Sequence, residues 1–205
     1  MGGLFDHLAA LFERGHARPV EGLLDDAQFA RDGRQTPAAV LIAVTERDEP
    51  GVILTQRPSG MRDHPGQVAF PGGKLDPGED AVAAALREAE EELSLPRDQV
   101  QVVGTSDLYR TGTGFDVTPV LGVIPPDLPL VPHPDEVADW FEAPLELLFD
   151  PASWRSNEVM WRGHMRRYLE LDYEGFRIWG VTAAIIANLA RRVEWRADNW
   201  RPRAR

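Results

Sequence analysis

The chain contains no cysteine, and it has neither a long apolar run nor many basic residues. The lack of cysteine excludes disulfide bonds and thiolate-based metal or redox centres. No stretch approaches the roughly 18 consecutive apolar residues of a membrane-spanning helix. The N-terminus also lacks the basic start, apolar stretch and small-residue cleavage site of a secretory signal. We therefore expect a cytoplasmic protein that does not associate with a membrane.

Acidic residues outnumber basic ones, with 33 Asp and Glu against 22 Lys and Arg, so that the formal net charge is -11. Such a chain repels polyanions at long range, and a nucleic acid is therefore not an expected partner. To bind a small anionic substrate, the chain would need local positive charge, supplied either by metal ions or by a cluster of Arg and Lys. The 205 residues, of which 43% are hydrophobic, fit one compact domain over 1–205 with a hydrophobic core.

Apolar residues recur at helical spacing in 3–14, 80–93 and 178–193, which predicts three helices. Strands are expected at 38–44, 51–57, 67–70, 99–103 and 115–124, and as a hairpin at 159–161 and 168–171. Because strands and helices are interleaved without strict alternation, we expect an α/β sandwich with a mixed sheet. The first helix should dock on the core. A helix on a membrane surface is the alternative, which Asp6 and Glu13 disfavour.

The helix expected at 80–93 carries three carboxylates on one side. Glu88, Glu91 and Glu92 are spaced i, i+3 and i+4, and neighbours at these spacings lie about 5–6 Å apart at Cβ. Like charges so placed destabilise a helix by a few tenths of a kcal/mol per pair. The carboxylates alone fit a solvated surface better than a metal site. A divalent cation would nevertheless offset the repulsion, and clustered oxygen ligands suit Mg²⁺ or Mn²⁺ rather than zinc.

The residues around these carboxylates complete a longer pattern. Gly73 is followed after five residues by Glu79, and after seven more by the run Arg87-Glu88-Ala89-Glu90-Glu91-Glu92-Leu93-Ser94-Leu95. This stretch, 73–95, resembles the Nudix box of the Nudix hydrolases, which cleave diphosphate bridges in nucleotide derivatives. Every charged position matches. Ser94 departs from the pattern, because the box has glycine there, at the position that closes the helix.

The resemblance implies the Nudix-type α/β/α sandwich with a mixed β-sheet. It also implies that Glu88 and Glu92 bind Mg²⁺ or Mn²⁺, with Glu91 as a third ligand or as a catalytic base that orients water. A divalent ion would neutralise the negative charge that builds up on phosphate oxygens during hydrolysis and would activate water.

Further residues of the box would support these carboxylates. Arg87 would fix them by charge-assisted hydrogen bonds, and Glu79 would act through water or through Arg87. Gly72 and Gly73 would let the backbone approach metal or phosphate closely, since glycine has no side chain in the way. Glu136, which follows a proline-rich connection at 125–134, could also reach the metal.

The segment 53–73 precedes the box without a gap. It begins Ile53-Leu54-Thr55-Gln56-Arg57, contains a second arginine, Arg62, and ends Phe70-Pro71-Gly72-Gly73. It looks like the extension that marks the coenzyme A pyrophosphatase branch of the Nudix family, although Pro58 replaces the small residue usual there. Arg57 and Arg62 are then expected to bind substrate phosphates, and His64 and Lys74 add positive charge nearby. Without the motif, the sequence would equally well indicate that these arginines form ordinary surface ion pairs.

The resemblance predicts that coenzyme A is split into 4′-phosphopantetheine and adenosine 3′,5′-bisphosphate. One rival is a Nudix hydrolase for ADP-ribose, a dinucleotide or a nucleoside triphosphate. Another is a non-catalytic module that senses a nucleotide, which the complete set of carboxylates disfavours. The number of metal ions and the identity of the base stay open, and a homodimer is possible.

Overall fold

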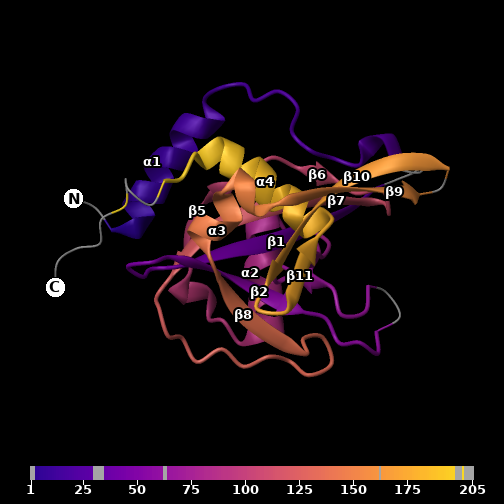
Figure 1. Cartoon of the computed structure of the whole chain (residues 1–205). Coiled ribbons are helices and arrows are strands. Elements are labelled where there is room, and N and C mark those ends of the chain that lie inside the picture. The colour runs from indigo at the N-terminus through magenta and orange to yellow at the C-terminus, as the bar shows by residue number, and fades with distance from the viewer. Residues whose placement is uncertain (1–2, 30–34, 62–63, 162, 197–199, 201–205) are drawn as a thin grey trace.

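A mixed sheet forms the centre of the computed structural model, which describes residues 3–29, 35–61, 64–161, 163–196 and 200 (Figure 1). Its strands are β1 (Thr36–Thr45), β2 (Gly51–Gln56), β3 (Val68–Ala69), β4 (Gly72–Lys74), β5 (Gln101–Thr105), β6 (Tyr109–Arg110), β7 (Phe115–Ile124) and β8 (Asp139–Pro144). The order is β3-β2-β1-β7-β5, with β4 also paired to β1, β6 to β7 and β8 to β2. β1 and β7 are parallel, whereas the other pairs are antiparallel.

Helices cover both faces of this sheet, as the sandwich expected from the sequence requires. They are α1 (Leu4–His16), α2 (Ala81–Leu93), α3 (Leu145–Phe149) and α4 (Val181–Val193). β1 shows how the layers form, because successive side chains of a strand point to opposite faces. Leu41 and its odd-numbered neighbours pack in the cluster that contains the alanines of α2. Ile42 and its even-numbered neighbours pack in the cluster that contains residues of α1 and α4.

The continuous apolar run of β1 follows from this double burial. The expectation for the N-terminal helix also agrees with α1, whose Leu4 and Leu8 are fully buried against the core. In the described part of the chain, no helix combines the length and the apolar character that crossing a membrane requires. The expectation that 1–205 forms one domain stays a prediction.

A second sheet, of order β11-β10-β9, consists of β9 (Arg155–Trp161), β10 (His164–Tyr173) and β11 (Phe176–Trp179). Its β9–β10 hairpin projects from the body of the molecule (Figure 1). These strands are longer than the expected 159–161 and 168–171. Their outer halves carry charged cross-strand pairs such as Glu158 with Arg167, at 2.9 Å, which lack the apolar alternation by which strands are recognised.

The expected start of the last helix at residue 178 was wrong by three positions. Ile178 and Trp179 belong to β11, and α4 begins at Val181. Gly180 separates the two elements with a φ of 65°, a backbone conformation that glycine adopts without steric cost. The apolar run across this boundary is shared by the end of a strand and the start of a helix, so its periodicity alone does not locate the break.

Candidate metal and diphosphate site

Helix α2 lies close against the sheet because its buried side is made of small residues. Ala84, Ala85 and Ala89 are fully buried there, whereas Val82 and Leu86 are half-buried. Asp80 caps the N-terminus by accepting a 2.8 Å hydrogen bond from the backbone N–H of Ala83. The same close packing buries one of the carboxylates of the helix.

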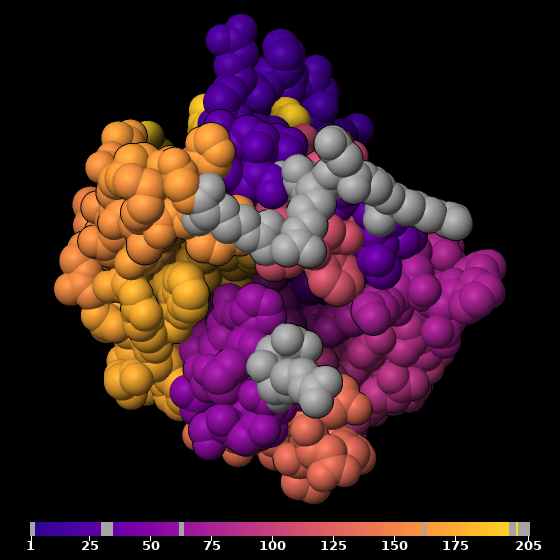
Figure 2. All heavy atoms as spheres, turned by 90° about the vertical axis from the view of Figure 1, so that its right-hand side faces the viewer, coloured from indigo at the N-terminus to yellow at the C-terminus, as the bar shows by residue number. Residues whose placement is uncertain are grey.

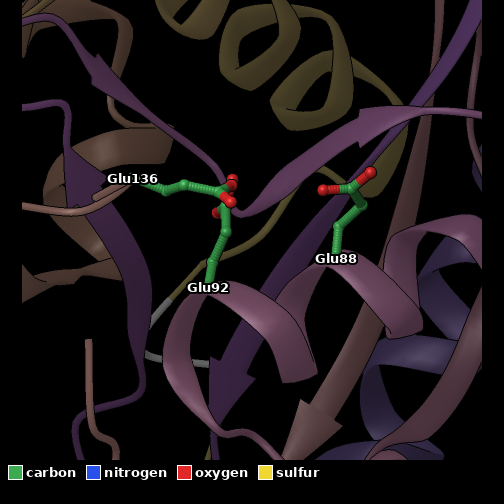
Figure 3. Close-up of side chains that lie close together, drawn as sticks. All are labelled: Glu88, Glu92 and Glu136. Carbon is green, nitrogen blue, oxygen red and sulfur yellow. The ribbon is translucent and has the colours of Figure 1, made fainter. Parts of the chain in front are cut away.

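Three carboxylates converge beside α2. Glu88 and Glu92 project from the helix and Glu136 approaches from the connection between β7 and β8 (Figure 3). One oxygen of each lies within 4.8 Å of the others. Glu92 is only 6% exposed, and its Oε2 atom is buried without a hydrogen-bond partner in the described chain. The sequence pattern named Glu88 and Glu92 as ligands and gave Glu136 as a candidate.

The electrostatics of this cluster indicate that it suits a cation. Burial, followed by the nearby Glu88 carboxylate, raises the pKa of Glu92 to about 8. Burial also raises the pKa of Glu88, against the opposing effect of Arg87. Ionised carboxylates are costly in such surroundings unless positive charge compensates them. A divalent cation would supply that charge, and it would take up the unpartnered oxygen of Glu92.

The segment before β8 reaches this position because it caps the C-terminal end of α2. The last carbonyl groups of a helix have no partner within the helix. Here Leu93 O accepts from Val131 N at 2.9 Å, and Glu92 O accepts from His133 N at 2.8 Å. Glu136 follows three residues later, on the turn in which its own N–H donates to His133 O at 3.0 Å. Sequence spacing could not reveal this contact, since it joins residues about forty positions apart.

Arg87 organises the outer side of the site. Its Nε and Nη2 atoms donate to the two oxygens of Glu79, both at 3.0 Å, and Nη2 also donates to Lys74 O at 3.0 Å. Its Nη1 atom donates to Glu88 at 2.9 Å and to Glu91 at 3.0 Å. Arg87 thereby holds the pKa of Glu79 below its usual range. The Glu91 side chain is 55% exposed and does not belong to the converging trio.

The two glycines before the box stand where side chains would not fit. β4 pairs with β1 so that Gly72 lies opposite Val40 and Gly73 opposite Ala39. A Cβ atom on Gly73 would overlap the carboxylate of Glu88, and one on Gly72 would overlap the backbone of β1. The backbone at Gly73 therefore lies close against the Glu88 carboxylate, and its predicted approach to metal or phosphate stays a prediction.

Arg57 is a second basic residue whose charge acts on the carboxylates. It follows β2 directly, and its positive charge lowers the pKa of Glu92, opposing the larger effect of burial. Its Nε atom is buried and has no hydrogen-bond partner among the described residues. Lys74 points elsewhere, with its Nζ atom 5.9 Å from the centre of the Phe115 ring. Arg62 lies outside the described residues.

Comparison with known proteins gives a consistent result. The NUDIX domain profile matches residues 35–162. The chain is 45% identical over 157 residues to the uncharacterized Nudix hydrolase NudL of Enterobacter sp. (strain 638), a match that covers 76% of this chain and 82% of that protein. NudL of Escherichia coli (strain K12) matches with the same identity and coverage. Among solved structures, RenU, a Nudix hydrolase from M. smegmatis, has a similar fold, with a TM-score of 0.53 and 23% identity over 83% of this chain and 92% of that chain.

Proposed function

Because the chain belongs to the Nudix hydrolase family, we propose that it hydrolyses the diphosphate bond of coenzyme A or its derivatives. The products would be 4′-phosphopantetheine and adenosine 3′,5′-bisphosphate. The observation that carries the chemistry is the convergence of Glu88, Glu92 and Glu136 on one point.

Nudix hydrolases generally use divalent metal ions, and the residues here fit one. Glu88, Glu92 and Glu136 would hold it, since all three offer oxygen ligands of the kind that Mg²⁺ and Mn²⁺ prefer. The buried Oε2 atom of Glu92, which has no hydrogen-bond partner among the described residues, supports this assignment independently of the family. When bound, such an ion neutralises charge on phosphate oxygens and lowers the pKa of bound water.

The other residues of the site accept a proton or hold the carboxylates in position. We assign to the Glu91 carboxylate, which is exposed and outside the trio, the proton that water loses as its oxygen bonds to one phosphorus. The bond between that phosphorus and the bridging oxygen breaks, and the other half of the substrate leaves with the bridging oxygen on its phosphate. Arg87 positions Glu88 and Glu91 through its Nη1 atom, and Glu79 fixes the guanidinium from the other side. Gly73 leaves room for the Glu88 carboxylate, which a larger residue would displace.

Coenzyme A is favoured by the segment 53–73, which resembles the extension of the coenzyme A pyrophosphatase branch. In the structure this segment runs along β2 and β3 and ends in β4 beside Glu88. Its Arg57 has a buried donor without a partner in the described chain, and arginine suits phosphate recognition. Arg57 and Arg62 are therefore proposed to bind the phosphates of the substrate.

A substrate panel tests this proposal. The purified chain is assayed with Mg²⁺ or Mn²⁺ against coenzyme A, ADP-ribose, a dinucleoside polyphosphate and a nucleoside triphosphate, with products separated by chromatography. We expect kcat/KM to be highest for coenzyme A and the two named fragments to appear. Faster turnover of ADP-ribose or a dinucleotide would overturn the substrate assignment. Binding without metal-dependent cleavage would instead indicate a nucleotide sensor.

A matched pair of variants belongs to the same experiment. Glu88→Gln removes one carboxylate of the trio, whereas Glu90→Gln removes a carboxylate of the same helix that pairs with the exposed Arg97 at 2.7 Å. Only the first should abolish metal-dependent turnover. A homodimer and a cytoplasmic location remain part of the proposal, and light scattering of the purified protein measures the oligomeric state.

A further inference from the structure

We propose that an aromatic wall, made of Phe29, Phe115 and Trp161, binds the nucleobase of the substrate, and that the ion pair between Asp26 and Arg166 holds this wall in place. The inference deepens the proposed function and rests on it for the identity of the substrate. None of these residues belongs to the box or to the segment that precedes it.

The ion pair ties the β9–β10 hairpin to the body of the molecule. Arg166 of β10 donates to both carboxylate oxygens of Asp26, with 3.0 Å between Nε and Oδ1. The side chain of Asp26 is 7% exposed and that of Arg166 is 18% exposed. The backbone N–H of Asp26 also donates to Arg110 O of β6 at 2.9 Å. Such a buried, bidentate pair fixes the orientation of both partners.

Trp161 lies against Arg166, Phe29 and the loop at Gly112. The Arg166 guanidinium lies 5.4 Å from the centre of the indole ring, and Phe29 meets that ring edge-on at 5.7 Å. A Cβ atom on Gly112 would lie 2.8 Å from the Trp161 ring and 3.2 Å from Phe29. The hairpin therefore closes directly on the loop that leads into β7.

Phe115 places a further aromatic ring beside the Lys74 side chain. Phe115 begins β7 immediately after that loop, and its ring lies 5.9 Å from the Nζ atom of Lys74. The carbonyl oxygen of Lys74 in turn accepts a hydrogen bond from Arg87. Figure 2 shows the face of the molecule hollowed between the hairpin, the β2–β3 connection and the α2 region. A substrate held at the carboxylates can thus extend past Lys74 toward the aromatic residues.

The chemistry of the wall suits a flat ring. Nucleobases stack on the rings of phenylalanine and tryptophan and on the plane of an arginine guanidinium. Such stacking depends little on which base is bound. The pantetheine half of coenzyme A is a flexible aliphatic amide chain, for which an aromatic wall offers no comparable geometry. We therefore assign the adenine half of the substrate to this side of the site.

The test compares inhibition by the two products of coenzyme A cleavage. Trp161→Ala removes the wall directly, and Arg166→Met removes the ion pair. Each should raise the inhibition constant of adenosine 3′,5′-bisphosphate about tenfold. The inhibition constant of 4′-phosphopantetheine should stay unchanged. KM for coenzyme A should rise in parallel, whereas kcat should change far less, because the carboxylates are untouched.

Two neighbouring residues provide controls from the opposite face of the hairpin. Met160 is 63% exposed and adjoins Trp161, and Arg167 adjoins Arg166 and pairs with Glu158. Met160→Ala and Arg167→Met should leave both inhibition constants unchanged. Melting curves and near-ultraviolet circular dichroism show whether each variant is folded. If Arg166→Met does not fold, Trp161→Ala and the milder Trp161→Phe decide the outcome.

The proposal is overturned if folded Trp161→Ala binds adenosine 3′,5′-bisphosphate as the unaltered protein does, or if only 4′-phosphopantetheine binding weakens. Failure of the proposed function is seen separately, in the unaltered protein, as absence of coenzyme A cleavage. If that protein cleaves ADP-ribose instead, AMP and ribose 5-phosphate replace the two inhibitors. Weaker binding of AMP alone then supports the wall, and unchanged binding of AMP contradicts it.

Discussion

Arg87 uses all three guanidinium nitrogens within the site, where it donates hydrogen bonds to three carboxylates and one carbonyl oxygen. A lysine keeps the positive charge but has a single nitrogen at the end of a flexible chain, so it cannot reproduce this planar set of bonds. Groups that orient metal ligands from behind typically contribute 10- to 100-fold to affinity or activity. Arg87 is therefore best understood as a positioning residue.

We predict that Arg87→Lys lowers kcat by about 10- to 100-fold with a small change in melting temperature. Steady-state kinetics with a saturating divalent ion measure the effect. Arg97→Lys is the matched control, because Arg97 pairs with Glu90 of the same helix but both side chains are about half exposed, at 48% and 46%. Equal losses in the two variants would show that Arg87 has no special role.

Gly73 is a second residue whose identity follows from the site. We predict that Gly73→Ala lowers kcat/KM about 100-fold, because the added Cβ displaces the Glu88 carboxylate and small misplacements at a reacting centre are this costly. Gly60→Ala is the control, since no atom of the described residues lies within 4 Å of the Cβ that it would add. Activity of Gly73→Ala close to that of Gly60→Ala would contradict the close approach described here.

Among the elements, α2 and β1 could be predicted from the sequence, because each combines a strong local pattern with the burial that this pattern reflects. The Nudix box predicted that Glu88 and Glu92 lie on the same side of α2. The apolar run at 38–44 predicted a strand, and that strand is buried on both faces. β8, with Phe141 and Ala143 buried and its other residues partly or fully exposed, was missed within a stretch rich in acidic residues and proline. The positions of Glu136 and of the aromatic wall depend on contacts between distant segments, which no local pattern encodes.

Ser94, the one departure from the box, has a structural explanation at the end of α2. It has a φ of 54°, the left-handed conformation in which glycine is usual, and its hydroxyl donates to Val131 O at 3.3 Å. Compared with glycine, the serine is less favourable in the left-handed conformation, but its hydroxyl adds a hydrogen bond to the segment that carries Glu136.

We predict that Ser94→Ala destabilises the protein by about 1 kcal/mol, because it keeps the left-handed backbone and loses the hydrogen bond. Ser94→Gly should be more stable than Ser94→Ala, since glycine relieves roughly 1–2 kcal/mol of steric cost in this conformation. Denaturant unfolding of the three proteins measures the difference. An alanine variant as stable as the glycine variant would argue against both effects.

For the whole molecule, Arg192 of α4 joins three parts of the chain. It donates to both oxygens of Asp107, at 2.7 and 2.8 Å, and to Gly15 O and Arg18 O at 3.1 and 2.6 Å. This single side chain therefore links α4 to α1 and to the connection between β5 and β6. The guanidinium holds the pKa of Asp107 below its ordinary value of 3.8.

A group whose pKa is lowered on folding stabilises the protein above its unfolded pKa, and this contribution is lost as the pH falls through the folded value. We predict that Asp107→Asn lowers the free energy of unfolding by about 1.5–3 kcal/mol at pH 7. The difference from the unaltered protein should shrink below about pH 4. Urea unfolding across this range measures it, and a difference independent of pH would exclude the ion pair as its cause.

The central claim, that Glu88, Glu92 and Glu136 together bind a divalent cation, is tested most directly by anomalous scattering from crystals soaked in Mn²⁺. A manganese peak between these three carboxylates, absent from crystals of Glu92→Gln, is the result that we predict. A map from soaked crystals of the unaltered protein with no peak at the trio, or with the ion bound elsewhere, would contradict the assignment.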